Sequence, residues 1–274
     1  MSKKVYEKVT DQIIKKLEEG TIPWRMPFKA GGFPVNYVTQ KAYRGVNTLL
    51  LEPGEYATFK QIKDNGGKVK KGAKSKMVVF WKLIDAEDED TGEEIKVPLM
   101  RTYNVFKIGE QTEGLEPKRQ EKGFEHDPIE EAEKLIKGYA DAPAYTSESG
   151  RAYYRPSADL VNVPPKEDFK VIEEYYSTFF HEIVHSTGHQ RRLNRPGITE
   201  FNGFGTETYS KEELVAELGA SMLCATVGIE NATLDNSAAY IESWLKALKD
   251  DRTMIISASQ QAQKAVDHIQ GTEF

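Results

Sequence analysis

Residues 180–189 read Phe180-His181-Glu182-Ile183-Val184-His185-Ser186-Thr187-Gly188-His189, and this stretch decides how the C-terminal half of the chain is interpreted. On a helix, His181 and His185 are four residues apart and project from the same face. Two imidazoles at this spacing can bind one Zn²⁺, while Glu182 reaches the water on the metal and takes its proton. The HExxH pattern therefore predicts a zinc-dependent metallopeptidase with His181 and His185 as ligands and Glu182 as the catalytic base.

A third protein ligand is needed, because a catalytic zinc keeps its fourth position for water. The longer pattern HExxHxxGxxH would place that ligand at position 191, which is Arg191 in this chain and cannot bind a metal. We favour Glu213 as the ligand, which makes the site gluzincin-like. We expect Glu217, four residues later, to accept a hydrogen bond from a ligating histidine. His189 is the alternative third ligand.

The segment 211–227 that carries these carboxylates is predicted to be a helix. Small residues on it allow close approach to the motif helix: Ala216, Gly219 and Ala220. A simpler role is open for Glu212 and Glu213, which can stabilise the first turn of a helix capped by Ser210. That role does not exclude metal binding. The oxyanion stabiliser is not evident, with Tyr209 and His268 as the candidates.

Outward from the motif, the apolar periodicity predicts an α+β protein with two domains. Helices are expected over 3–19, 58–65, 129–139, 166–188, 211–227, 238–250 and 253–269, and strands over 77–84, 95–107, 143–145 and 152–163. We expect an N-terminal domain over 1–110, a linker over 111–127 and a metallopeptidase domain over 128–274. The strand over 152–163 is expected to pair with an extended peptide substrate.

Composition narrows the class of protein. The chain has 274 residues, 39% of them hydrophobic and 29% charged, which is a globular balance. The single cysteine, Cys224, excludes an internal disulfide and a cysteine-based zinc ribbon. No apolar run has the length of a membrane span, and the N-terminus lacks a secretory apolar core. We therefore expect a cytoplasmic protein without a membrane partner.

Charge divides the chain unevenly. Residues 1–82 hold 17 Lys and Arg against 7 Asp and Glu, whereas the remaining 192 residues hold 20 basic and 36 acidic residues. The overall charge of −6 is therefore the average of a basic region and an acidic one. This asymmetry indicates that the basic region meets a polyanion.

The basic region interleaves cations with aromatic residues. Lysines bind phosphates and aromatic rings stack on unpaired bases, so the pattern is typical of sequence-tolerant binding of single-stranded DNA. The candidate DNA-binding residues are Trp24, Arg25, Tyr43, Arg44, Lys60, Lys68, Lys70, Lys71, Lys74, Lys76 and Trp81. The alternative is that the aromatic residues form the core. We favour that for Phe59, Phe80 and Phe106, and leave it open for Trp24, Tyr43 and Trp81.

These motifs, in this order, resemble the ArdC-type antirestriction proteins over nearly the whole chain. The N-terminal matches are Ile22-Pro23-Trp24, Asn36, Ala42-Tyr43-Arg44-Gly45-Val46-Asn47, Thr58-Phe59-Lys60-Gln61, Val69-Lys70-Lys71-Gly72 and Tyr103-Asn104-Val105-Phe106. The C-terminal matches are Tyr153, Asp159, Tyr176, residues 180–189, Arg192-Leu193 and residues 212–217.

The resemblance implies an N-terminal domain that binds single-stranded DNA without strong sequence preference and a zincin-like metallopeptidase domain. It also implies protection of incoming plasmid or phage DNA from host restriction. Two functions are consistent with this resemblance. One is a zinc protease that cleaves an unknown protein near DNA, and the other is a protein that shields DNA by binding it and whose peptidase fold is structural or regulatory. A zinc-dependent nuclease is a third alternative, which the HExxH pattern disfavours.

Overall fold

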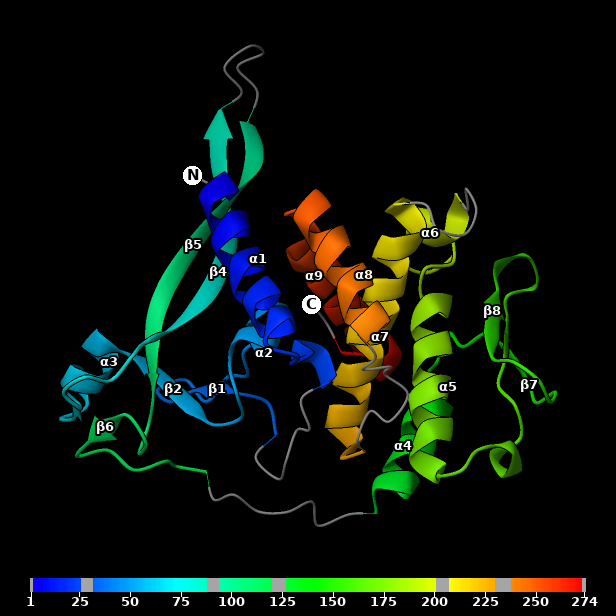
Figure 1. Cartoon of the computed structure of the whole chain (residues 1–274), viewed down its shortest axis with the longest axis horizontal. Helices are drawn as coiled ribbons and strands as arrows, with labels where there is room; N and C mark the ends of the chain where they lie inside the picture. Colours follow the sequence, from blue (N-terminus) through cyan, green and yellow to red (C-terminus); the bar gives the residue numbers. More distant parts are fainter. Residues whose placement is uncertain are drawn as a thin grey trace.

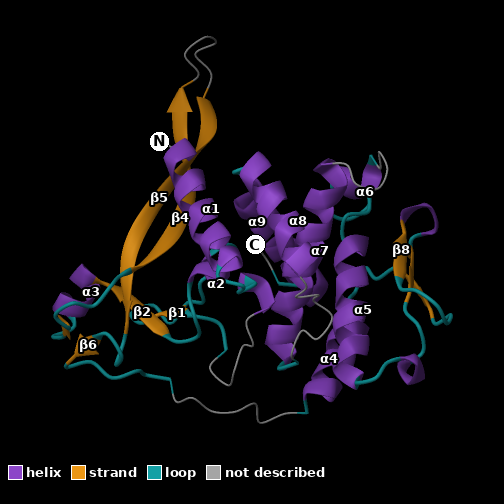
Figure 2. Ribbon diagram, viewed as in Figure 1, coloured by secondary structure: helices purple, strands orange, loops and turns teal. Residues whose placement is uncertain are grey.

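The computed structural model describes residues 2–25, 32–87, 94–119, 127–200, 207–229 and 238–272. The fold is α+β, as expected: a sheet with a long hairpin lies at one side, and a helical body with a small sheet lies at the other (Figures 1 and 2). The N-terminal elements are α1 (Ser2–Glu18), η1 (Pro23–Arg25), β1 (Val35–Asn36), α2 (Asn47–Leu50), β2 (Glu55–Thr58), α3 (Phe59–Asp64), β3 (Lys68–Val69), β4 (Lys76–Glu87), β5 (Glu94–Lys107) and β6 (Thr112–Glu113). The C-terminal elements are α4 (Pro128–Gly138), β7 (Ala144–Thr146), β8 (Tyr153–Arg155), η2 (Pro156–Ala158), β9 (Leu160–Asn162), η3 (Lys166–Asp168), α5 (Ile172–Ser186), α6 (Pro196–Thr199), α7 (Glu207–Val227), α8 (Ala238–Asp250) and α9 (Met254–Gln270).

The N-terminal sheet has the strand order β1-β2-β5-β4, and β4 and β5 form the long antiparallel pair predicted from the sequence. Successive side chains of a strand point to opposite faces of the sheet. Val79 and Met100 are buried in the core on the face that α1 and α2 cover. Phe80, one residue after Val79, and Tyr103 are exposed and line the opposite face. One face of the sheet is therefore packed against helices. The other face is partly covered, because Val78 and Val105 lie in a small buried cluster with Tyr43, Leu51 and Tyr56, and it is open to solvent around Phe80 and Tyr103.

The expected linker differs from the structure over 111–119. Thr112 pairs with Val69 in the two-stranded sheet β3-β6, and Leu115 is buried in a small cluster with Ile62 and Ile108. The backbone N–H of Arg119 donates to the Glu55 carboxylate. Residues 112–119 thus belong to the N-terminal sheet region, and residues 120–126 lie outside the described part of the chain.

The C-terminal body packs α5 against α7 and α7 against α9. A three-stranded sheet with the order β7-β9-β8 lies beside α5, so β8 is an edge strand. The strand expected over 152–163 is in fact two antiparallel strands, because Pro156 begins a 3₁₀ turn and Asp159 ends it with a left-handed φ of 46°. The helix expected over 166–188 is α5 preceded by a separate 3₁₀ turn.

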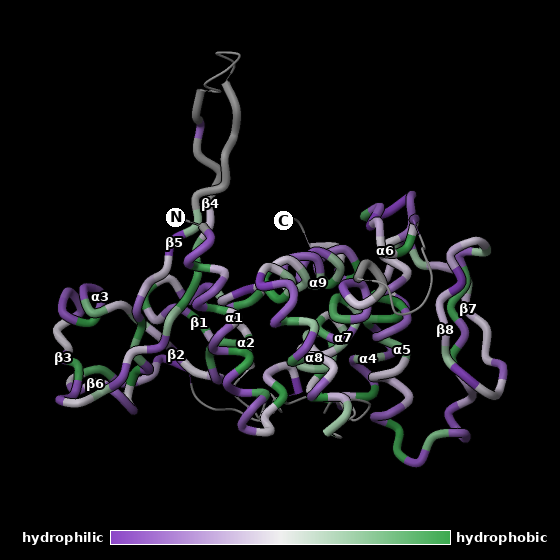
Figure 3. The backbone as a smooth tube through the Cα atoms, turned by 45° about the horizontal axis from the view of Figure 1, so that its top comes forward, coloured by the Kyte–Doolittle hydropathy of each residue, from purple (hydrophilic) through white to green (hydrophobic). Residues whose placement is uncertain are grey.

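One hydrophobic core joins the two halves of the molecule. Val9, Ile13 and Leu17 of α1 belong to the same buried cluster as residues of α7 and α9. Trp24 of η1 packs edge-to-face on Trp244 of α8, with ring centroids 6.0 Å apart. In Figure 3, hydrophobic and hydrophilic stretches alternate along α1 and the C-terminal helices, as expected of helices that bury one side. Among the helices that the structure describes, none combines the length and apolar character of a membrane span.

Candidate metal centre and basic surface

Helices α5 and α7 approach each other closely at a glycine. A Cβ atom added to Gly219 of α7 would lie 2.8 Å from both methyl carbons of Val184 on α5, closer than carbon atoms pack. Glycine at this position therefore lets the two helices come together. The close approach brings the carboxylate-bearing turn of α7 over the histidines of α5.

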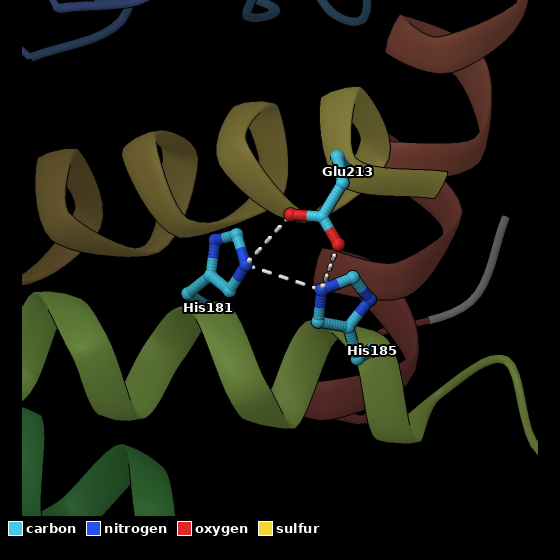
Figure 4. Close-up of side chains that lie close together, drawn as sticks. All are labelled: His181, His185 and Glu213. Atoms are coloured by element: carbon cyan, nitrogen blue, oxygen red, sulfur yellow. Dashed lines mark hydrogen bonds and ion pairs between the residues drawn. The ribbon is translucent and has the colours of Figure 1, made fainter. Parts of the chain in front are cut away.

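His181 and His185 of α5 and Glu213 of α7 converge on one point (Figure 4). The Nε2 atoms of the two histidines are 3.1 Å apart, and the Glu213 carboxylate oxygens lie 3.6 Å from His181 Nε2 and 3.5 Å from His185 Nε2. Ligand atoms of a tetrahedral zinc are about 3.3 Å apart, given bonds of about 2.0–2.1 Å. The three side chains therefore fit a single divalent cation.

Glu212, the residue before Glu213, lies behind His185. Its Oε1 atom is 3.2 Å from His185 Nδ1, so that nitrogen carries the proton and leaves the Nε2 lone pair for a metal. Arg195 holds Glu212 with two hydrogen bonds, of 2.9 Å from Nε and 2.6 Å from a terminal nitrogen. Arg195 also donates to the hydroxyl of Thr187 and the carbonyl of Val184 at the end of α5. This buried network fixes the orientation of the His185 ring.

The charges of this network offset the cost of burial. Burial disfavours a charged Glu212, but hydrogen bonds from Arg195 and His185 outweigh it and hold the pKa of Glu212 below its ordinary value. Burial likewise disfavours a protonated His185, yet the hydrogen bond to Glu212 and the charge of Glu213 raise its pKa. Both effects describe a negatively charged pocket that favours a cation beside His185.

The expected role of Glu217 is wrong. Its carboxylate accepts a hydrogen bond of 3.0 Å from Trp24 Nε1 and a second from the hydroxyl of Tyr240. It therefore faces the N-terminal segment and α8, and Glu212 takes the position beside His185 that was expected for Glu217. Helix α7 also begins at Glu207, so Ser210 lies inside it and does not cap it.

The other candidate residues lie apart from the cluster. His189 follows the end of α5, where its Nδ1 atom accepts a hydrogen bond from the backbone of Arg191. His268 packs on Tyr139, with Asp141 beyond it, and does not line the pocket over the histidines. The side chain of Tyr209 lies outside the described residues.

A pocket of about 800 Å³ opens over the histidines and Glu213. Glu182, 8% exposed, lines it from α5, and Tyr153, Tyr154 and Arg155 of the edge strand β8 line it from the other side. Since β8 pairs only with β9 among the described strands, its outer edge is free to pair with an extended chain.

The predicted basic residues lie mainly on the N-terminal sheet region. The exposed lysines are Lys60, Lys68, Lys70, Lys71, Lys74 and Lys76. Within the described part of the chain, two of them have carboxylate partners: Lys60 pairs with Asp64, and Lys76 lies 3.9 Å from Glu52. Lys70 donates to the carbonyls of Gly109 and Glu110, which holds the segment between β3 and β4 against the end of β5.

The exposure of the aromatic side chains differs from the expectation. Trp24 is 2% exposed and belongs to the core, whereas Trp81 is 51% exposed. Phe59 and Phe80, which we expected in the core, are 61% and 50% exposed. The side chain of Tyr43 is buried, but it still forms part of the wall of a second pocket, which lies on the face of the sheet that carries Phe80. Trp24 is thus excluded as a DNA contact, and Phe80 was missed because the run 77–81 is apolar on both faces of the strand.

The two arginine candidates lie near the C-terminal body. Arg25 is half-buried in η1, which contacts α7. Arg44 is half-exposed and pairs with Asp267 of α9. We call the six exposed lysines and Trp81 the basic surface; the two arginines lie near the C-terminal body and do not extend it.

Comparisons with known proteins agree with this architecture. Residues 3–106 match the family model of the N-terminal domain of the anti-restriction factor ArdC, and residues 130–261 match that of a zincin-like metallopeptidase. The metal-free structure of the antirestriction protein ArdC from plasmid R388 is 38% identical, with a TM-score of 0.77 over 98% of this chain and 99% of that one. Its Mn(II)-bound structure is 36% identical, with a TM-score of 0.77 over 97% of each chain.

Curated relatives include a protein of similar length and a much longer one. The chain is 34% identical to the uncharacterized protein y4eC of Sinorhizobium fredii, over 96% of this chain and 90% of that protein. It is 33% identical to the DNA primase TraC of Escherichia coli, but covers only 20% of TraC. The near-complete match to a solved ArdC confirms the expected resemblance. The chain therefore belongs to the ArdC family of antirestriction proteins, with an ArdC N-terminal domain followed by a zincin-like metallopeptidase domain.

Proposed function

We propose that this protein binds single-stranded DNA through its N-terminal domain, hydrolyses peptide bonds at the metal centre, and protects incoming mobile-element DNA from host restriction. The convergence of His181, His185 and Glu213, with Glu182 beside them, is the observation that carries the hydrolytic part. The exposed lysines and Trp81 support the DNA-binding part.

Zn²⁺ is the cation that the donor set favours. Two imidazoles and one carboxylate are the protein ligands of a well-known class of catalytic zinc sites, in which the remaining position is open. When bound, such a cation polarises a carbonyl oxygen and makes water more acidic. His181, His185 and Glu213 would hold it, and Glu212 keeps the proton of His185 on Nδ1 so that Nε2 stays available.

The residues around the centre perform the remaining tasks of hydrolysis. Strand β8 would align an extended peptide along its free edge, with backbone hydrogen bonds that are tolerant of side-chain identity. The Glu182 carboxylate would take a proton from the attacking water and deliver it to the nitrogen of the departing amine. Glu182 is held inside the pocket, 8% exposed, where a proton transfer is shielded from bulk water.

Glu182→Gln tests the hydrolytic proposal. The amide keeps the size of the side chain but cannot accept the proton, so we expect cleavage of fluorescent casein to fall by roughly 10²–10⁴-fold. Zinc content and affinity for single strands should remain those of the wild type. Unchanged casein cleavage by this variant would contradict the proposal.

The same variant separates an active protease from a DNA-binding shield. If cleavage is needed for protection, transfer of a plasmid carrying Glu182→Gln into a restricting host should fall to the level of a deletion. Full protection by the inactive variant would assign protection to DNA binding alone. Labelled single strands incubated with the zinc-loaded protein should stay intact, and strand breaks would favour a nuclease.

A further inference from the structure

The open face of the N-terminal sheet holds a pocket of about 440 Å³, a size typical of small-ligand sites. Its walls come from four strands, β1, β2, β4 and β5, from Tyr43 in the loop after β1 and from the first turn of α3. The side chains that give the pocket its character are Asn36, Tyr43, Gln61, Phe80, Arg101 and Tyr103. The metal centre uses none of them.

Aromatic rings form the wall of the pocket. Phe80 lies edge-to-face with Tyr103, with centroids 5.6 Å apart, and with Tyr43, at 6.2 Å. Phe80 and Tyr103 are 50% and 42% exposed, so their outer surfaces are available for stacking. The strand register pairs Phe80 with Arg101, whose exposed guanidinium stands at the rim. Rings beside a cation suit a nucleotide, which has a flat base and an anionic phosphate.

The polar floor presents hydrogen-bond donors. The Gln61 oxygen accepts from the backbone N–H of Thr58 at 2.9 Å, which completes the capping box of α3. The Asn36 oxygen accepts from two backbone N–H groups, of Val38 and Thr39, each at 3.0 Å. These backbone donors fix which way both side-chain amides point, so their NH₂ groups turn away from the backbone.

Two donors of this floor are unused by the described residues. The Asn36 NH₂ group points to the Gln61 oxygen at 3.4 Å and to the Tyr43 hydroxyl oxygen at 3.5 Å, but the Gln61 NH₂ group itself has no acceptor among the described residues. The Tyr43 hydroxyl accepts from Asn36 and keeps its own proton to donate. Burial raises the pKa of that hydroxyl, so it stays protonated at neutral pH. The floor therefore offers a pair of N–H and O–H donors.

We propose that this pocket takes one unpaired base of bound single-stranded DNA and selects bases with two neighbouring acceptors, guanine (O6 and N7) or cytosine (O2 and N3). The inference rests on the proposed DNA binding and adds a base preference to it. Adenine offers a donor beside each of its acceptors on these edges, and thymine separates its two oxygens by an N–H, so both leave one floor donor unpaired. Stacking on Phe80 and the contact of Arg101 with phosphate are common to all bases.

Fluorescence anisotropy with short oligomers of dC, dA and dT at one salt concentration tests the preference. We expect the wild type to bind the dC oligomer roughly tenfold more tightly than the dA and dT oligomers, which is the low end of a bidentate base contact. Equal affinities would overturn the inference while leaving the proposed function intact. No binding of any oligomer would overturn both, and tighter binding of an rC oligomer would overturn the assignment to DNA.

Gln61→Glu sharpens the test without breaking the capping box. One carboxylate oxygen still accepts from Thr58, but the other replaces the free NH₂ donor with an acceptor. The ratio of dC to dA affinity should fall to one or below. Lys60→Gln is the matched control, since it makes the same change in charge at the neighbouring residue and should lower all affinities equally. An unchanged ratio in Gln61→Glu would contradict the proposed floor.

Two further variants separate stacking from hydrogen bonding. Tyr43→Phe removes a donor but keeps the ring, so it should reduce the preference for dC and leave dT binding unchanged. Phe80→Ala should weaken all oligomers, whereas Phe59→Ala, an exposed aromatic outside the pocket, should weaken none of them through this site. Equal effects of the two phenylalanine variants would contradict the placement of the base.

Discussion

The metal centre and the basic surface hold their functional groups in opposite ways. At the centre, His185 is fixed by the buried Glu212, and Glu212 in turn by the buried Arg195. On the basic surface, the lysines are exposed and their few ion pairs lie in solvent. A buried charge that loses its partner is costly, whereas an exposed pair contributes little. The centre should therefore depend on single residues, and the basic surface on the sum of many.

The largest expected effect is the loss of metal in Glu213→Ala. Removing one of three protein ligands should lower zinc affinity by at least about a thousandfold, because two histidines at i and i+4 bind zinc only weakly by themselves. Metal analysis after dialysis measures it. His189→Ala is the control, since His189 lies after the end of α5 and should leave the zinc content unchanged. Full zinc occupancy in Glu213→Ala would contradict the proposed ligand set.

The second effect tests the buried network. Arg195→Met leaves the Glu212 carboxylate, 4% exposed, without its main cation, and should reduce the free energy of unfolding by about 3–5 kcal/mol. Urea denaturation measures it, and the double variant with Glu212→Gln should recover part of the loss. Arg191→Met, which removes a pair with a 71% exposed arginine, should cost less than about 1 kcal/mol. Similar losses in both single variants would contradict the contrast between a buried and an exposed ion pair.

The third effect tests the additive surface. Changing five lysines to glutamate should lower affinity for single strands by on the order of a hundredfold and reduce its salt dependence, with zinc content unchanged. The five are Lys68, Lys70, Lys71, Lys74 and Lys76.

A set of five exposed lysines on the C-terminal helices provides the control for this surface. Reversing them makes the same change in total charge: Lys134, Lys137, Lys246, Lys249 and Lys264. The control should bind DNA several-fold more tightly than the first set. If both sets weaken binding equally, net charge and not the basic surface determines the affinity.

The smallest effect concerns Glu217, which lies where η1 of the N-terminal segment meets α7 and α8. Burial raises the pKa of Glu217 to about 7, above its ordinary value of 4.5. The folded protein therefore holds this proton more tightly than the unfolded chain, and stability falls as the pH rises from about 4.5 to about 7. Glu217→Gln should remove this loss of about 1–3 kcal/mol, visible as a flatter dependence of the melting temperature on pH. An unchanged pH profile would contradict it.

The sequence predicts those parts of the metal centre that depend on one helix at a time. The spacing of His181 and His185 follows from helical geometry, and the structure has them side by side. The neighbours Glu212 and Glu213 point about 100° apart on α7, so which of them meets the cluster depends on how α7 crosses α5. The sequence does not specify that crossing. Glu217 lies one turn further along, where α7 meets Trp24 and Tyr240 instead.

The sheet was predicted in outline, but its exposed face was not. Both β4 and β5 were expected, yet Val78, Val79 and Phe80 are all apolar, so the alternation that marks a buried face is missing. Only the placement of α1 and α2 decides that Val79 is covered and Phe80 is free. Trp24 shows the converse, since its neighbour Arg25 suggested a nucleic-acid contact, while Glu217, 193 residues away, holds it in the core.

The core that α1 shares with α7 and α9 has a consequence for dividing the protein. A chain cut after residue 119 would yield two pieces that each expose an apolar face, because Val9, Ile13 and Leu17 cover residues of the C-terminal helices. Such pieces should be poorly soluble apart and reassemble when mixed, as in a split reporter. Exchanging whole domains between relatives would likewise place α1 of one protein against the C-terminal helices of another, whose buried side chains differ. Functional chimaeras should therefore take α1 and the helices it covers from the same relative.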